Sequence, residues 1–132
     1  MIKTITRWKK DHEFEAEHHG NKISMDGAVK NGHGPKALLL SALAGCSGID
    51  LVDILTKMRV PFFSLEIEVE TTQTEEPPKV FNDIVIHYKI QTDREYEKKV
   101  KKAINLSLEK YCGVAAMLKK NSTISYHLSI EP

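Results

Sequence analysis

The chain contains two cysteines, and their surroundings make them the residues most able to do chemistry. Cys46 lies among small residues in segment 41–48, and Cys112 lies in segment 109–114, which reads as the head of a helix. Small neighbours leave a sulfur accessible to a substrate. Because the thiolate is the nucleophilic form of cysteine, two sulfurs that meet in the fold could form a redox pair. The alternative is that both are buried and act as small hydrophobic residues.

The composition predicts one cytoplasmic domain. A length of 132 residues fits a single domain over residues 1–132. The 19 Lys and Arg residues balance 18 Asp and Glu residues, which argues against a nucleic-acid partner. The sequence contains no run of about 18 apolar residues, so we expect no membrane span. The N-terminus lacks the apolar core of a secretory signal. Permanent structural disulfides are rare in the cytoplasm, so catalytic, redox or buried roles are expected for the cysteines.

The hydrophobic pattern predicts an α+β protein with antiparallel sheet. Strict alternation over 63–70, followed by an apolar strand over 80–90, predicts a long hairpin. Pro35 suits the first turn of a helix, which we expect to continue to Lys57. The expected order is strands 2–8, 14–18 and 23–25, helix 35–57, strands 63–70 and 80–90, helices 96–108 and 111–118, and strand 124–130.

The expected helix 35–57 carries more apolar surface than one face of a sheet can cover. At 1.5 Å per residue it is about 35 Å long, and its apolar residues wrap most of its circumference. Gly45 and Gly48 interrupt it and would allow another helix or a substrate to approach closely. A dimer that buries the excess apolar surface is the simplest expectation.

The sequence resembles the OsmC/Ohr superfamily (osmotically induced protein C and organic hydroperoxide resistance protein). The resemblance covers nearly the whole chain and rests on Gly34-Pro35, on segment 38–47 with Asp50, and on segment 108–118. It implies an intertwined homodimer, in which antiparallel sheets from both chains wrap around two long central helices. It also implies two active sites at the subunit interface.

The same resemblance implies an activity, because the studied members reduce organic hydroperoxides. Cys46 is then the peroxidatic thiol that attacks the peroxide oxygen, and Cys112 is the resolving thiol that forms a disulfide with it. An external dithiol restores both thiols by exchange. No cofactor and no metal is expected. The other function class is a non-enzymatic or reduced-activity protein that binds a small hydrophobic ligand at the dimer interface.

The charge that would activate Cys46 is not evident from the sequence. Cys46 lies about three turns into its helix, too far for the N-terminal dipole to stabilise a thiolate. Well-studied members of the superfamily use an arginine before the long helix and a glutamate just inside it. Segment 20–36 contains no arginine, and Lys36 or Ala37 stands at the expected glutamate position. Arg7, on the first strand, is a candidate that would reach across the dimer.

Two acidic residues accompany the cysteines. Asp50 follows Cys46 by four residues and so shares its helix face. A carboxylate there either disfavours the thiolate or anchors a lysine from the other chain, and both interpretations stay open. Glu109 precedes Cys112 by three residues and is a candidate for orienting a cation near it, although a solvent-facing position is more frequent for a helical glutamate.

Histidines and glutamates alternate in the N-terminal third of the chain. His12 and His18 share one face of the expected strand, whereas Glu13, Glu15 and Glu17 share the other. Neither face forms a compact set of ligands, so we expect solvated strand residues rather than a metal site.

Overall fold

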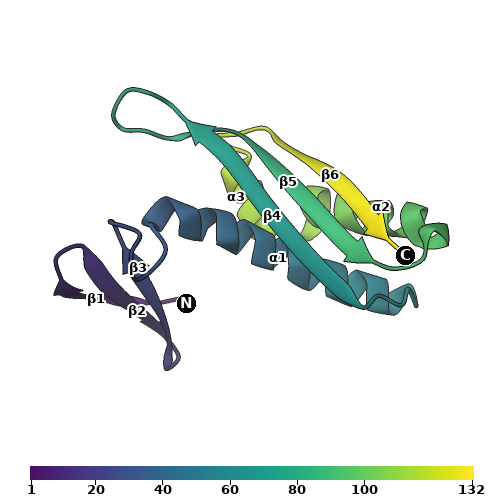
Figure 1. Cartoon of the computed structure of the whole chain (residues 1–132), viewed down its shortest axis with the longest axis horizontal. Coiled ribbons are helices and arrows are strands. Elements are labelled where there is room, and N and C mark those ends of the chain that lie inside the picture. The colour runs from purple at the N-terminus through teal and green to yellow at the C-terminus, as the bar shows by residue number, and fades with distance from the viewer. The chain divides into compact units, whose positions relative to one another are not determined.

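The computed structural model describes all 132 residues and divides into two units, Met1–Leu40 and Ser41–Pro132. In chain order the elements are β1 (Ile5–Lys10), β2 (Glu13–His18), β3 (Asn21–Asp26), α1 (Pro35–Lys57), β4 (Ser64–Gln73), β5 (Phe81–Gln91), the 3-10 turn η1 (Arg94–Tyr96), α2 (Glu97–Leu106), the π-helical turn η2 (Ser107–Tyr111), α3 (Gly113–Leu118) and β6 (Ile124–Glu131) (Figure 1). The predicted α+β class is confirmed. The single domain expected over residues 1–132 stays a prediction.

The first unit contains an antiparallel sheet in the order β1-β2-β3. Alternation along the strands gives this sheet one charged and one apolar face. Arg7 pairs with Glu17 at 3.2 Å on the charged face. On the other face Trp8 lies opposite Phe14. Trp8 is 65% exposed and Ile23 is 53% exposed, so large apolar side chains of this sheet remain open to solvent.

A buried aspartate fixes the turn that follows β3. The Asp26 carboxylate accepts hydrogen bonds from the backbone N–H groups of Ala28 at 2.8 Å, Asn31 at 3.1 Å and Lys30 at 3.2 Å. These bonds, the one from Ala28 most, hold the pKa of Asp26 below its usual value. The Asp26 N–H also donates to the His33 carbonyl at 3.0 Å. The segment expected to be a loop before Pro35 is therefore held in one conformation by Asp26.

The second unit contains a sheet in the order β4-β5-β6. The predicted hairpin of β4 and β5 is confirmed, because the two strands pair antiparallel from Ser64↔Gln91 onward. β6 differs from the expected antiparallel sheet, since it pairs parallel to β5. The reason is the connection between them. The chain passes through α2, η2 and α3 before β6, and a crossover of this length returns it to the end where β5 began.

One face of this sheet packs against the helices and forms the core. Alternate residues of β5 point into this core, and Leu43, Leu51 and Leu55 of α1 are completely buried there. α2 adds Val100 and Ile104. The helices lie on the same side of β4, β5 and β6 (Figure 1). The opposite face is polar and carries Glu66, Glu68, Glu70, His87, Lys89 and His127.

α1 is long and apolar enough to cross a membrane by length and composition alone. An 18-residue window of it has a mean hydropathy of 1.8, although no uninterrupted apolar run is present. The core helix of a soluble protein passes the same test, and α1 contributes several fully buried residues to the core. Only 22% of the window is buried, and Ile49 is 67% exposed. The predicted excess of apolar surface on this helix is therefore confirmed.

Candidate active site

The fold brings the two cysteine thiols together. Cys46 is half-buried on α1, and Cys112 lies between η2 and α3 with only 3% of its surface exposed. A hydrogen bond joins the two side chains, and both are free thiols. Residues that are far apart in the sequence thus form one pair of sulfurs, close enough for Cys46 to influence the ionisation of Cys112.

A change of helix type positions Cys112. α2 continues into η2, a π-helical turn, and the Cys112 N–H donates to the Ser107 carbonyl at 2.7 Å. α3 then begins at Gly113, two residues later than expected, with Cys112 as its N-cap. The Ala115 N–H donates to the Cys112 sulfur at 3.4 Å. π-helical turns occur often at functional sites because they re-aim the side chains around them.

The surroundings of Cys112 keep it protonated. Burial is the largest of the effects that raise the pKa of Cys112 to about 11, followed by the hydrogen bond with Cys46 and the negative charge of Asp50. The hydrogen bond from the Ala115 N–H acts in the opposite direction but is outweighed. No lysine or arginine is among the groups that shift this pKa. At neutral pH Cys112 is therefore a thiol.

A chain of buried hydroxyl groups leads from the core to Asp50. The Tyr88 hydroxyl lies 2.6 Å from the Ser47 Oγ, which lies 3.0 Å from the Ser107 Oγ. Ser107 in turn donates to Oδ2 of Asp50 at 2.9 Å. Tyr88, Ser47 and Ser107 are at most 1% exposed. Each serine is linked to one cysteine. Ser47 directly follows Cys46 in the sequence, and the Ser107 carbonyl accepts a hydrogen bond from the Cys112 N–H.

These hydrogen-bonded hydroxyl groups were not predicted from the sequence. The sequence nevertheless indicates them, because polar residues occupy positions where the hydrophobic pattern of α1 and β5 calls for apolar ones. Ser47 lies four residues after Leu43 and four before Leu51, on the buried stripe of α1. Tyr88 occupies an inward position of β5 between Ile86 and Ile90. A polar group at such a position needs a buried partner, and each serves as partner to the other.

Asp50 also faces a cavity. This cavity has a volume of about 590 Å³, within the range of small-molecule sites. Its lining residues are Asp50, Asp53, Ile54, Lys57, Met58, Leu106 and Tyr111. Neither cysteine is among them, so within one chain this cavity is not lined by the sulfur pair.

Glu109 and two of the candidate cations, Lys36 and Arg7, are exposed. Glu109 is exposed in η2 and is not among the groups that shift the pKa of Cys112. Lys36 is exposed at the second position of α1. Arg7 is paired with Glu17 on the first sheet.

A second hollow, of about 540 Å³, runs along α1 and is mainly apolar. It is lined by Ala44, Gly45, Gly48, Ile49, Val52, Asp53, Leu65 and Ile67. A Cβ atom on Gly48 would lie 3.1 Å from Cδ1 of Ile67, so this glycine lets α1 pack closely on β4. A Cβ atom on Gly45 would meet nothing within 4 Å. The Gly45 side of α1 is therefore open.

The chain is similar to known proteins in both sequence and fold. The family described as "OsmC-like protein" matches residues 27–127. Protein YhfA of Escherichia coli K12 is 40% identical over 113 residues, which cover 83% of this chain and 84% of YhfA. The OsmC-like protein of Mycoplasma pneumoniae shares the fold with a TM-score of 0.87 at 18% identity, covering 100% of this chain and 98% of that one.

The organic hydroperoxide resistance protein OhrB of Bacillus subtilis also shares the fold. Its TM-score is 0.65 at 17% identity, and the match covers 98% of both chains. The family match and the relative in Escherichia coli each span most of the sequence, as the resemblance of the two cysteine segments predicted. The chain belongs to the OsmC-like protein family.

Proposed function

We propose that this protein reduces organic hydroperoxides with Cys46 as the peroxidatic thiol and Cys112 as the resolving thiol. The observation that carries the proposal is the hydrogen bond between the two side chains, because a sulfenic acid on one sulfur would form within reach of the other. Family membership supports it, as does the fold shared with OhrB of Bacillus subtilis, whose name refers to organic hydroperoxide resistance.

The reaction has three steps. The Cys46 thiolate attacks the peroxide oxygen, the O–O bond breaks, and the alkoxide takes a proton and leaves as the alcohol. The Cys112 sulfur then attacks the Cys46 sulfenic acid. The thiol proton and the sulfenic hydroxyl leave as water, and a disulfide forms. An external dithiol is oxidised to its own disulfide in restoring both thiols.

Asp50 and Ser107 act as positioning residues in this proposal. Ser107 binds Asp50 through its hydroxyl and Cys112 through its carbonyl, so it ties the carboxylate to the backbone of the resolving cysteine. The negative charge of Asp50 adds to the burial that raises the pKa of Cys112, and so helps to keep this sulfur protonated. Glu109 stays a predicted residue for orienting a cation near the site.

We further propose that two copies of this chain form a dimer through the hollow on α1. Ile49 and Val52 line this hollow and are 67% and 43% exposed, and Gly45 leaves room for a second helix. Burial of this surface by another copy removes apolar groups from water. The second chain is then the source of the cation that stabilises the Cys46 thiolate. We place the dimer in the cytoplasm, where thiols are kept reduced.

The alternative function is the binding of a small hydrophobic ligand without chemistry. The cavity of about 590 Å³ beside Asp50 favours it, because its size suits a small molecule and its lining includes Ile54, Met58 and Leu106. The raised pKa of Cys112 also lowers the reactivity of that sulfur.

Turnover measurements separate the two functions. The proposal expects the reduced protein to consume an alkyl hydroperoxide repeatedly when a dithiol is supplied. Cys46→Ser should abolish consumption, and Cys112→Ser should allow one reaction per site and then stop. Ser125→Ala, on an exposed strand position, is the matched control and should keep full activity. Equal activity in the protein and in Cys46→Ser would reject the proposed reaction.

A further inference from the structure

The solvent-facing side of the second sheet carries a row of potential metal ligands. Glu68 on β4 lies directly opposite His87 on β5, and His87 lies directly opposite His127 on β6. Directly opposed residues point to the same face of a sheet, so the three side chains form a line across all three strands. Tyr88 points the other way, into the core, so this row is separated from the hydroxyl chain by the sheet itself.

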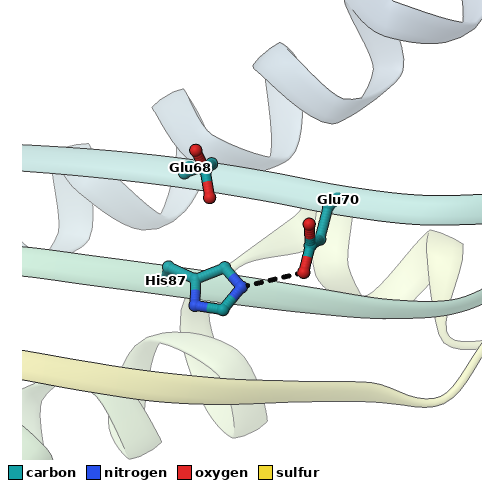
Figure 2. A group of neighbouring side chains, drawn as sticks. All are labelled: Glu68, Glu70 and His87. Atoms are coloured by element: carbon teal, nitrogen blue, oxygen red, sulfur yellow. Dashed lines mark hydrogen bonds and ion pairs between the residues drawn. The ribbon is translucent and has the colours of Figure 1, made fainter.

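Glu70 completes a compact group with two of these residues. Its Oε1 lies 3.1 Å from Nε2 of His87, and the two side chains point toward each other, with Glu68 nearby on the strand that carries Glu70 (Figure 2). One ligand atom from each of Glu68, Glu70 and His87 lies within 4.8 Å of the others. Ligand atoms about 2.0–2.2 Å from a tetrahedral zinc ion lie about 3.4 Å apart. Rotation of the exposed Glu68 and Glu70 side chains is enough to bring the ligand atoms from within 4.8 Å of one another to this spacing.

His127 lies next to this group but outside the set within 4.8 Å, and its ring would turn to bring a second nitrogen to it. Its ring stacks on the His87 ring, with 5.2 Å between the centroids and 22° between the planes. A hollow of about 250 Å³ lies at this place, and Glu68, His87 and His127 are among its lining residues. The nearby Lys89 ammonium is paired with Glu131 at 3.2 Å.

We propose that Glu68, Glu70, His87 and His127 bind a divalent transition-metal ion of the zinc class. Two imidazoles distinguish this group from an ordinary acidic patch, since carboxylates alone would suit Ca²⁺ or Mg²⁺, whereas imidazole suits Zn²⁺. The ligands come from three neighbouring strands, so a bound ion joins β4, β5 and β6. The site goes beyond the proposed peroxide chemistry, and its ligands do not include either cysteine.

Zinc titration by calorimetry tests this site. The protein is used without an affinity tag and as the Cys46→Ser/Cys112→Ser variant, because thiolates bind zinc themselves. The expected result is one Zn²⁺ per chain. His87→Gln should weaken binding at least about tenfold, a change of 1.4 kcal/mol. Glu66→Gln removes a carboxylate from the same face of β4 but outside the group, and should leave the affinity unchanged.

A second readout locates the ion. Zn²⁺ should shift the imidazole proton NMR signals of His87 and His127 in step with the calorimetric saturation. It should also raise the melting temperature of the variant that lacks cysteines, because a ligand that binds only the folded state stabilises it. No binding of Zn²⁺, equal affinity in His87→Gln, or saturation with both histidine signals unmoved would each overturn the proposal. Circular dichroism of His87→Gln is the control for folding, and the spectrum should match that of the parent protein.

Discussion

The Ser107 hydroxyl lies between two oxygen atoms, Oδ2 of Asp50 at 2.9 Å and Oγ of Ser47 at 3.0 Å. A serine hydroxyl has a single proton. With Asp50 as a carboxylate, this proton goes to Asp50, because hydrogen bonds to charged acceptors are the stronger ones. Ser47 then donates to Ser107, and Tyr88 donates to Ser47. Asp50 thereby sets the direction of the three hydrogen bonds that join Tyr88, Ser47, Ser107 and Asp50.

Ser107→Ala should destabilise the protein by about 1–3 kcal/mol, because it leaves the Ser47 proton without an acceptor in a buried site. Urea unfolding measures the change as a shift of the midpoint. Ser125→Ala, which alters an exposed serine, should change the free energy of unfolding by less than about 0.5 kcal/mol. Equal stabilities of the two variants would contradict the hydrogen-bond chain.

Tyr88 should titrate well above an ordinary tyrosine. Burial is the main cause that raises the pKa of Tyr88 from 10.0 to about 12, and the hydrogen bond with Ser47 opposes it. Unfolding therefore releases a proton between pH 10 and 12, and this contribution to stability, on the order of 2 kcal/mol, is lost as the pH rises through that window. Tyr88→Phe should lose less stability over the same window than the parent does.

The control for this titration is Tyr111→Phe, which removes a tyrosine that is 55% exposed. It should leave the pH dependence of unfolding as it is in the parent protein. Ultraviolet difference spectra of the tyrosinate form follow the ionisation directly. A Tyr88 midpoint near pH 10 would show that this hydroxyl is not held in the buried chain.

Cys112 should be labelled by iodoacetamide with a pH midpoint near 11, since only the thiolate reacts. Mass spectrometry of the digested, fully reduced protein separates this label from that on Cys46. Cys46→Ala removes the hydrogen bond and the electrostatic effect by which Cys46 raises the pKa of Cys112. The midpoint should therefore fall, while burial keeps it above 9.0. A midpoint that does not move in Cys46→Ala would mean that the two sulfurs do not interact.

Ile49→Glu should convert the proposed dimer into a monomer. The side chain is 67% exposed on α1, so the single chain tolerates the change, whereas a dimer interface there would have to bury a charge. Light scattering during size exclusion reports the mass, expected to fall from twice the 14.9 kDa of one chain to that of one chain. Val80→Glu places the same charge on another partly exposed apolar residue and should leave the mass unchanged.

Local patterns predicted the local structure. Pro35 and the apolar spacing placed both ends of α1, and the alternation after Phe63 gave the hairpin of β4 and β5. The parallel pairing of β6 is a non-local property, because the alternation of Ile124, Tyr126 and Leu128 fits either direction equally well.

The candidate site was predictable only in part. The cysteines were recognisable by residue type, whereas the hydrogen-bonded chain of Ser47, Tyr88 and Ser107 depends on contacts between three separate elements. Separate helices were predicted over 96–108 and 111–118, but the π-helical turn η2 between α2 and α3 was not, since the apolar spacing is helical on both sides of it. The row of Glu68, His87 and His127 depends on the parallel pairing of β6, where antiparallel sheet had been predicted from the sequence.

The fate of both thiols after a single dose of peroxide shows whether Cys46 and Cys112 form a redox pair. The reduced protein receives one equivalent of cumene hydroperoxide, free thiols are counted, and mass spectrometry maps the products. The account predicts rapid loss of both thiols, an intramolecular Cys46–Cys112 disulfide and one equivalent of cumyl alcohol. Unchanged thiols at that dose would contradict it and would favour a ligand-binding role for the cavity beside Asp50.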